Sequence, residues 1–104
     1  MDLLTLIIKE YIFIVESLLL VYPVENERII VDREGFKATL EKNAYASFSQ
    51  KIKVYKDLRL IIHDSNNYTM PYKDKQLKKT VRKVIINYKT FRTVYEYTNK
   101  IIKM

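Results

Sequence analysis

The residues of this chain that are best suited to chemistry form one cationic cluster. Six cations fall within a stretch of eleven residues: Lys73, Lys75, Lys78, Lys79, Arg82 and Lys83. Ammonium and guanidinium groups at this density attract polyanions, because each can neutralise a phosphate or a carboxylate. An apolar run, Val84 to Ile86, follows directly. A cationic tip with an apolar root predicts an extended ribbon that presents its charge to a polyanionic partner.

The sequence holds few groups that could catalyse a reaction. His63 is the sole histidine and there is no cysteine, so the ligand set typical of a zinc site is missing, and we expect His63 at a strand end or on the surface. Asp32 with Glu34, and Asp57 with Asp64, are pairs of carboxylates that helix capping and solvation explain. The single glycine argues against a phosphate-binding glycine loop. We expect no enzymatic activity, no metal and no cofactor.

Charge is divided unequally along the chain. The formal net charge is +7. Residues 1–35 hold three basic and seven acidic side chains, a net charge of −4, whereas residues 36–104 hold sixteen basic and five acidic ones, a net charge of +11. Protecting an edge strand from pairing with other chains also uses lysines. That role alone would not require six cations at one tip beside an acidic first third, so the distribution favours polyanion binding.

The chain has the length and composition of one small globular domain. It has 104 residues, of which 48% are hydrophobic, and this predicts a single domain over residues 1–104. Lys9, Glu10 and Glu16 interrupt the apolar first segment, so no stretch approaches the roughly 20 uncharged residues that cross a bilayer. No basic segment with a small-residue cleavage site is present. We expect a cytoplasmic protein that does not enter the membrane.

The first half of the chain predicts three helices and a strand. Residues 3–21 repeat apolar side chains at helical spacing and predict a core helix. Its spare apolar edge, formed by Ile12, Phe13, Leu19 and Leu20, predicts a homodimer contact. A short strand is expected over 27–32, followed by a helix over 33–42 that Asp32 caps. Ser47 and Gln50 match the capping-box spacing and begin a helix over 48–58.

The second half predicts a basic hairpin and a last helix. Residues 60–62 continue as a strand, and a loop of turn formers follows over 64–67. We expect strands over 68–72 and 79–86, the wing, with Pro71 tolerated only at a sheet edge. A final helix, which Asn87 caps, is expected over 88–102. The predicted fold is therefore α+β, a winged helix-turn-helix with a basic two-stranded β-wing and an extra C-terminal helix.

At this point the chain resembles winged-helix DNA-binding proteins over nearly its whole length. The segment FSQKIKVYKDLRLII (48–62) and the basic ribbon that follows carry the resemblance. More narrowly, the size, layout and Lys/Ile/Tyr/Asn-rich composition look like the TcpK-type relaxosome accessory proteins of conjugative plasmids. That resemblance implies a non-catalytic protein that binds double-stranded DNA at a transfer origin and helps a relaxase or another relaxosome protein to assemble.

Two elements and two outlying lysines are expected to contact DNA. On the helix 48–58 the candidates are Ser49, Gln50, Lys51, Lys53 and Lys56, because Gln can pair with adenine and Lys can reach guanine acceptors. In the wing, Arg82 is expected to offer its planar fork to base edges or to a narrow minor groove. Lys37 and Lys42 are expected to add phosphate contacts. Because the wing holds six cations and the helix three, we expect the wing to contribute at least as much binding as the helix.

Three alternatives remain open from the sequence. A winged-helix transcriptional regulator would have the same features. A basic protein-assembly module without DNA specificity could use the same cationic face on an acidic partner. Nine tyrosines also raise the alternative of base stacking on single strands, with Tyr68 and Tyr72 as the best candidates.

Overall fold

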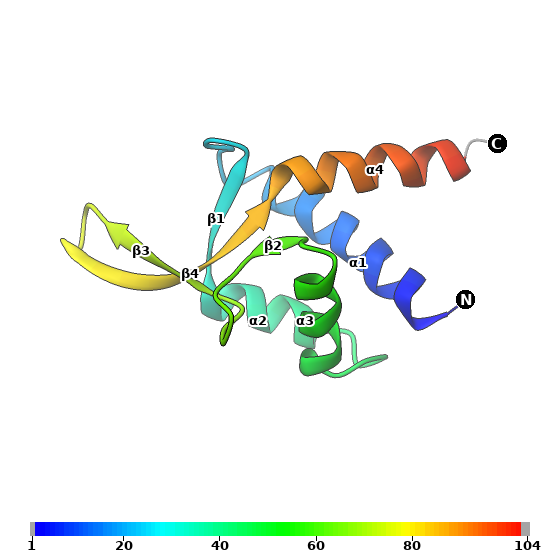
Figure 1. Cartoon of the computed structure of the whole chain (residues 1–104), viewed down its shortest axis with the longest axis horizontal. Coiled ribbons are helices and arrows are strands. Elements are labelled where there is room, and N and C mark those ends of the chain that lie inside the picture. Colours follow the sequence, from blue (N-terminus) through cyan, green and yellow to red (C-terminus); the bar gives the residue numbers. More distant parts are fainter. Residues whose placement is uncertain (1, 103–104) are drawn as a thin grey trace.

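A computed structural model of the protein describes residues 2–102, the last three by their backbone (Figure 1). Its elements are α1 (Leu3–Leu18), β1 (Arg28–Asp32), α2 (Arg33–Glu41), α3 (Phe48–Asp57), β2 (Ile61–Ile62), β3 (Met70–Asp74), β4 (Lys79–Asn87) and α4 (Tyr88–Ile102). This mixture of helices and one antiparallel sheet confirms the α+β class. Met1, Lys103 and Met104, which the predicted domain range 1–104 includes, lie outside the described residues.

The strand β4 is the centre of the sheet. Its second half pairs with β1 on one side and with β2 on the other, in the order β1-β4-β2. Its first half pairs with β3, from Asp74 opposite Lys79 to Met70 opposite Lys83. Figure 1 shows this part, residues 70–83 and hereafter the wing, as a narrow ribbon that extends away from the helices. The prediction that Pro71 lies on an edge strand is confirmed, because β3 pairs with β4 alone among the described strands.

The core lies between the sheet and the helices. Ile7, Tyr11 and Val15 of α1 are fully buried together with Val84 and Ile86 of β4. Apolar burial of this kind stabilises the fold by roughly 1.5–3 kcal/mol for each large side chain. The core also contains Ile12, which the sequence had placed on the spare outer edge of this helix. That prediction is wrong because α4 packs against α1 and covers a second part of its surface.

Short-range hydrogen bonds set the ends of the helices. The Asp32 carboxylate accepts from the Gly35 amide at 2.9 Å, and Ser47 and Gln50 form the predicted capping box at 3.1 and 2.8 Å. The Asn87 side chain accepts from the Thr90 amide at 3.2 Å, which confirms the third predicted cap. Each cap occupies an amide that the first helical turn leaves without a partner.

The helix α1 ends three residues before the predicted boundary at residue 21. The amides of Leu20 and Val21 bond to carbonyls three residues back, those of Ser17 and Leu18, instead of four. The chain tightens there because Pro23 forces the preceding residue out of the helical region.

Candidate functional site

The wing presents a dense group of exposed ammonium groups. Four of its lysines are exposed: Lys73, Lys75, Lys78 and Lys79. The turn between the strands is ordered by Asp74, whose carboxylate accepts from the amides of Gln76 and Leu77 at 2.8 and 3.0 Å. Lys78 closes the turn with a φ of 54°, in the left-handed region. The wing tip is therefore a well-defined hairpin whose ammonium groups are exposed to solvent and can bind an anion.

The cations of the wing are divided between its two faces. Residues opposite each other in an antiparallel pair share a face. Lys79 lies opposite Asp74, and Lys83 lies opposite Asp32 of β1. These two lysines therefore share their face with carboxylates. Lys73 belongs to the other face, which continues along β4 into the buried helix side of the sheet, and no acidic residue of β3 or β4 shares that side with it.

Arg82 holds a loop instead of presenting its guanidinium to solvent. Its Nε donates to the Thr69 hydroxyl at 2.8 Å, and its Nη2 donates to the Thr69 carbonyl at 2.8 Å and to the Asp64 carboxylate. The Arg82 side chain is 33% exposed. The prediction that Arg82 offers its planar fork to DNA is corrected, because acceptors at both ends of the loop 64–69 already occupy the fork.

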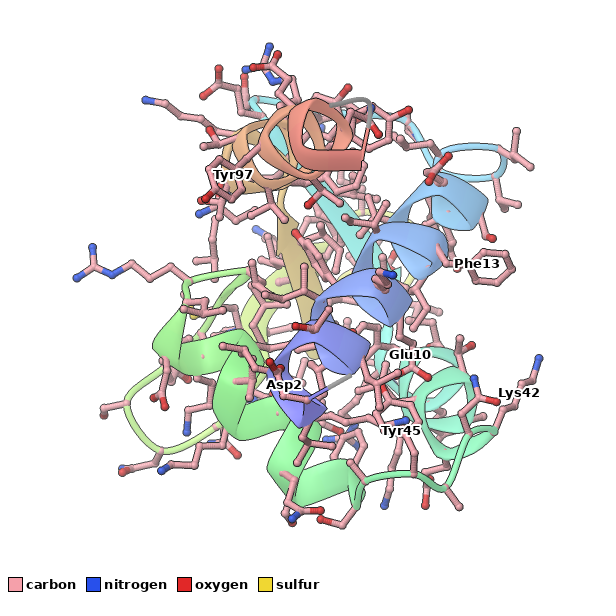
Figure 2. All side chains as sticks on the ribbon, turned by 90° about the vertical axis from the view of Figure 1, so that its right-hand side faces the viewer. Asp2, Glu10, Phe13, Lys42, Tyr45 and Tyr97 are labelled. Carbon is pink, nitrogen blue, oxygen red and sulfur yellow. The ribbon has the colours of Figure 1, made fainter. Side chains whose placement is uncertain are left out.

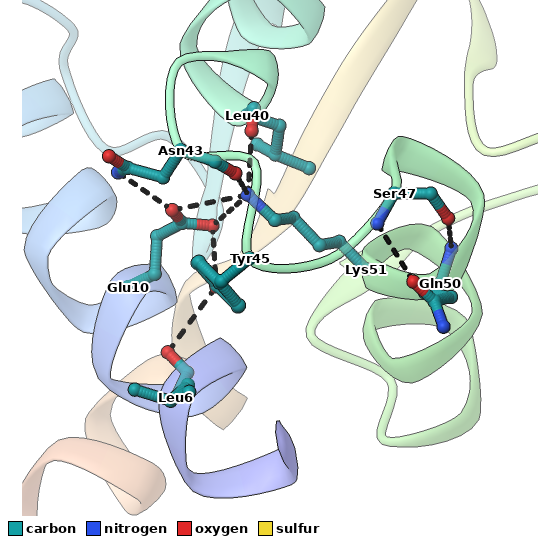
Figure 3. A network of polar contacts seen from close by, with 8 residues as sticks. All are labelled: Leu6, Glu10, Leu40, Asn43, Tyr45, Ser47, Gln50 and Lys51. Carbon is teal, nitrogen blue, oxygen red and sulfur yellow. Dashed lines mark hydrogen bonds and ion pairs between the residues drawn. The ribbon is translucent and has the colours of Figure 1, made fainter.

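Lys51 lies in the interior of the protein, and the prediction that it faces outward from α3 is wrong. Its side chain is 0% exposed, and the side chain of Glu10, its partner, is 8% exposed. The Lys51 ammonium donates to Glu10 and to the carbonyls of Leu40 and Asn43, the last two at 2.7 Å (Figure 3). All three ammonium protons thus have acceptors, which offsets the cost of burying the charge.

The carboxylate of Glu10 completes this buried network. It accepts from the Asn43 amide at 3.0 Å and from the Tyr45 hydroxyl at 2.9 Å (Figure 3). The centroid of the Tyr45 ring lies 4.3 Å from the Lys51 ammonium, a cation–π contact. Burial, with Glu10 as the next cause, raises the pKa of the Tyr45 hydroxyl. The network connects α1 to the turn between α2 and α3, and so sets the position of α3.

The exposed side of α3 carries fewer cations than the sequence indicated. Ser49, Gln50 and Lys53 are exposed, and Lys56 is half-buried. The Gln50 carboxamide is part of the cap, where its oxygen accepts from the Ser47 amide at 2.8 Å.

Lys37 and Lys42, predicted as outlying phosphate contacts, are both exposed. The Lys37 ammonium lies 5.5 Å from the ring of Phe48. Lys42 follows α2 as its C-cap and extends into solvent (Figure 2).

A crevice of about 460 Å³ with a mixed polar and apolar lining separates α3 from the loop that follows β2. Lys53, Lys56 and Asp57 line its α3 wall, and Asn66 and Asn67 line its loop wall. The ring of Tyr68 packs edge-on against Phe48 at 5.3 Å, which holds the loop beside α3. The sequence assigned Asn66 and Asn67 only to a loop, because a run of turn formers between two strands is typical of any connection.

The outer surface of α1 is unusually apolar. Phe13 is 71% exposed and points away from the protein (Figure 2). A separate apolar groove of about 570 Å³, which Phe13 does not line, lies between α1 and α4, and Ile8, Val94 and Tyr97 are among its lining residues. Exposed apolar surface of this kind is typical of an interaction site.

The sequence matches no model of a known protein family and no curated protein. Among the described helices, none has the length and hydrophobicity needed to cross a membrane.

Proposed function

We propose that this protein binds double-stranded DNA sequence-specifically as a winged helix-turn-helix protein, and that its wing contributes at least as much binding as α3. The order of the elements supports this assignment. Two helices joined by a short connection, α2 and α3, are followed by a strand and a hairpin, and β1 completes the sheet beside β4. This is the layout in which a winged helix presents its second helix and its wing to DNA. The helix α4 is an addition to that layout.

The observation that carries the proposal is the distribution of exposed cations. The wing offers four exposed lysines, whereas α3 offers Lys53 with Lys56 half-buried beside it. Phosphate neutralisation and the accompanying release of counterions supply much of the affinity of DNA-binding proteins. Lys51 is buried in an ion pair with Glu10, so α3 should contribute less to DNA affinity than its sequence suggests. The wing should therefore contribute a larger share of that affinity.

The salt dependence of binding to a duplex tests the leading role of the wing. The logarithm of the binding constant falls as the logarithm of the salt concentration rises, and we call the steepness of this fall the salt slope. Replacing Lys75 and Lys78 by alanine should make the salt slope shallower by about 1.8, because each lost phosphate contact removes about 0.9. Lys53→Ala should lower it by about 0.9 at most. A control with Lys9 and Lys89 replaced by alanine removes the same net charge from exposed positions on the other helices and should leave the slope unchanged.

If the Lys75 and Lys78 variant binds as the wild type does while Lys53→Ala abolishes binding, the wing does not lead. If the control variant weakens binding as much as the wing variant does, net charge alone explains the effect. If wild-type protein binds no duplex at any salt concentration, the protein is not a DNA-binding protein.

The resemblance to relaxosome accessory proteins suggests the biological setting. We place the protein in the cytoplasm, at the transfer origin of a conjugative plasmid, where it would bind DNA and contact a relaxase or another relaxosome protein. Binding to a transfer-origin duplex in preference to promoter DNA would support this setting over transcriptional regulation. The exposed Phe13 edge of α1 supports a homodimer, which would read two half-sites at a fixed spacing.

A further inference from the structure

The loop 64–69 is anchored at both ends although it has no regular structure. Arg82 bonds to Asp64 at one end of the loop and to Thr69 at the other, and Thr69 is itself buried. Next to Thr69, Tyr68 packs on Phe48 at the start of α3. One arginine and one aromatic contact thus fix the backbone on both sides of Asn66 and Asn67.

The two asparagines between these anchors are available to a ligand. Both are exposed, and neither side chain donates or accepts a hydrogen bond with another described residue. They line the crevice opposite Lys53 and Lys56. A carboxamide that is fixed by its backbone but free at its polar atoms can offer a donor and an acceptor side by side.

We propose that Asn66 and Asn67 read base edges of the bound duplex from this crevice, while Lys53 holds a neighbouring phosphate and Arg82 acts as the positioning residue. The inference rests on the proposed function and adds a specificity-determining pair to it. Asparagine pairs bidentately with adenine in the major groove. The facing wall carries two lysines, Lys53 and Lys56, and one carboxylate, Asp57, and its net positive charge matches the phosphates that flank any base.

The chemistry of the crevice favours base edges over stacked bases. Stacking requires a free aromatic face, and Tyr68, the aromatic side chain on the loop wall, is half-buried against Phe48. The groups that remain free on this wall are carboxamides, which recognise the hydrogen-bonding pattern of a base.

Selection of bound duplexes from a random pool, followed by affinity measurements on the selected and a random duplex, tests the proposal. The variant with Asn66 and Asn67 replaced by alanine should bind the selected duplex roughly 5- to 150-fold more weakly, the effect of losing one bidentate base contact. Its affinity for random duplex and its salt slope should not change. Asn26→Gly is the control, because it removes an exposed carboxamide from a turn with a φ of 51°, which glycine adopts freely.

Each other outcome overturns the proposal in a recognisable way. Selection with the double variant that returns the wild-type sequence preference would show that the asparagines do not read bases. An equal loss on selected and random duplex with a shallower salt slope would make them part of a backbone contact only. Absence of duplex binding by the wild type refutes the proposed function, and this inference with it, whereas binding without the asparagine effect refutes the inference alone.

The positioning role of Arg82 has its own readout. Arg82→Lys keeps the charge but loses the fork that joins Asp64 to Thr69. The ratio of affinities for selected and random duplex should fall toward that of the asparagine variant, with the salt slope unchanged. This ratio does not depend on how much of the variant is folded, because partial unfolding lowers both affinities by the same factor. An unchanged ratio would show that Arg82 does not position the asparagines.

Discussion

Replacing Lys51 by methionine should destabilise the protein without removing a DNA contact. Methionine has a similar length and fills the same space, so the change removes the charge and leaves the packing nearly intact. The Glu10 carboxylate, 8% exposed, would then keep only the Asn43 and Tyr45 donors. The carbonyls of Leu40 and Asn43 would also lose the ammonium that they accept from.

The expected cost follows from the burial of this pair. Removing one member of a buried ion pair costs about 3–5 kcal/mol, because the remaining charge loses its partner. A domain of this size has a free energy of unfolding of roughly 5–15 kcal/mol, so the variant would be close to the limit of folding. At about 4–8 °C per kcal/mol for a small domain, its Tm should fall by roughly 12–40 °C.

Lys53→Met is the matched control, because it makes the same substitution two residues away at an exposed position of the same helix. Its free energy of unfolding should stay within about 0.5 kcal/mol of the wild type. Urea unfolding followed by circular dichroism measures both variants. Adding Glu10→Gln to Lys51→Met should restore part of the loss, since a neutral carboxamide no longer needs a counter-charge.

DNA titration separates the two lysines further. Under conditions where the Lys51→Met variant is folded, its salt slope should equal that of the wild type, whereas Lys53→Met should lower the slope by up to about 0.9. If Lys51→Met is as stable as Lys53→Met, the buried network does not hold α3 in place. A shallower salt slope for the folded Lys51→Met variant would mean that Lys51 contacts phosphates. That result would contradict the conclusion that Lys51 is buried and unavailable to DNA.

Two further predictions concern alkaline pH and self-association. Burial raises the pKa of the Tyr11 and Tyr55 hydroxyls above the usual value near 10, so their contribution to stability is full below about pH 10 and is lost as the pH rises toward the raised values. The free energy of unfolding should therefore be lower at pH 11 than at pH 9. Tyr55→Phe removes a hydroxyl without a partner among the described residues and should reduce that difference. An equal difference in the wild type and the Tyr55→Phe variant would contradict this cause. Phe13→Asp should convert a dimer to a monomer in sedimentation with little change in unfolding free energy, and a wild type that sediments as a monomer both free and on DNA would rule out the dimer.

The elements of the fold could be predicted well from the sequence because the interactions that define them are local. The capping box joins Ser47 to Gln50, and the Asp32 cap reaches Gly35, each across three residues. Helical spacing and β-branched runs are likewise visible within one or two turns of chain. The wing was predicted with its strands within two residues of the observed bounds at each end, since its charge, its turn formers and Pro71 all lie inside the hairpin itself.

The roles of individual charged residues required the tertiary structure. Lys51 follows the same spacing as an exposed lysine in the sequence, but its acceptor Glu10 lies 41 residues away and encloses it only when α1 packs beside α3. In the sequence, Arg82 lies in a run of cations and has no evident acceptor. In the folded protein, its guanidinium donates to Asp64 and Thr69. The sequence alone determined that this protein has a cationic wing beside a short helix. Long-range contacts decided which cations remain free to bind a partner. A charged side chain is buried or exposed according to the residues that pack over it, and those residues cannot be identified from the neighbouring sequence.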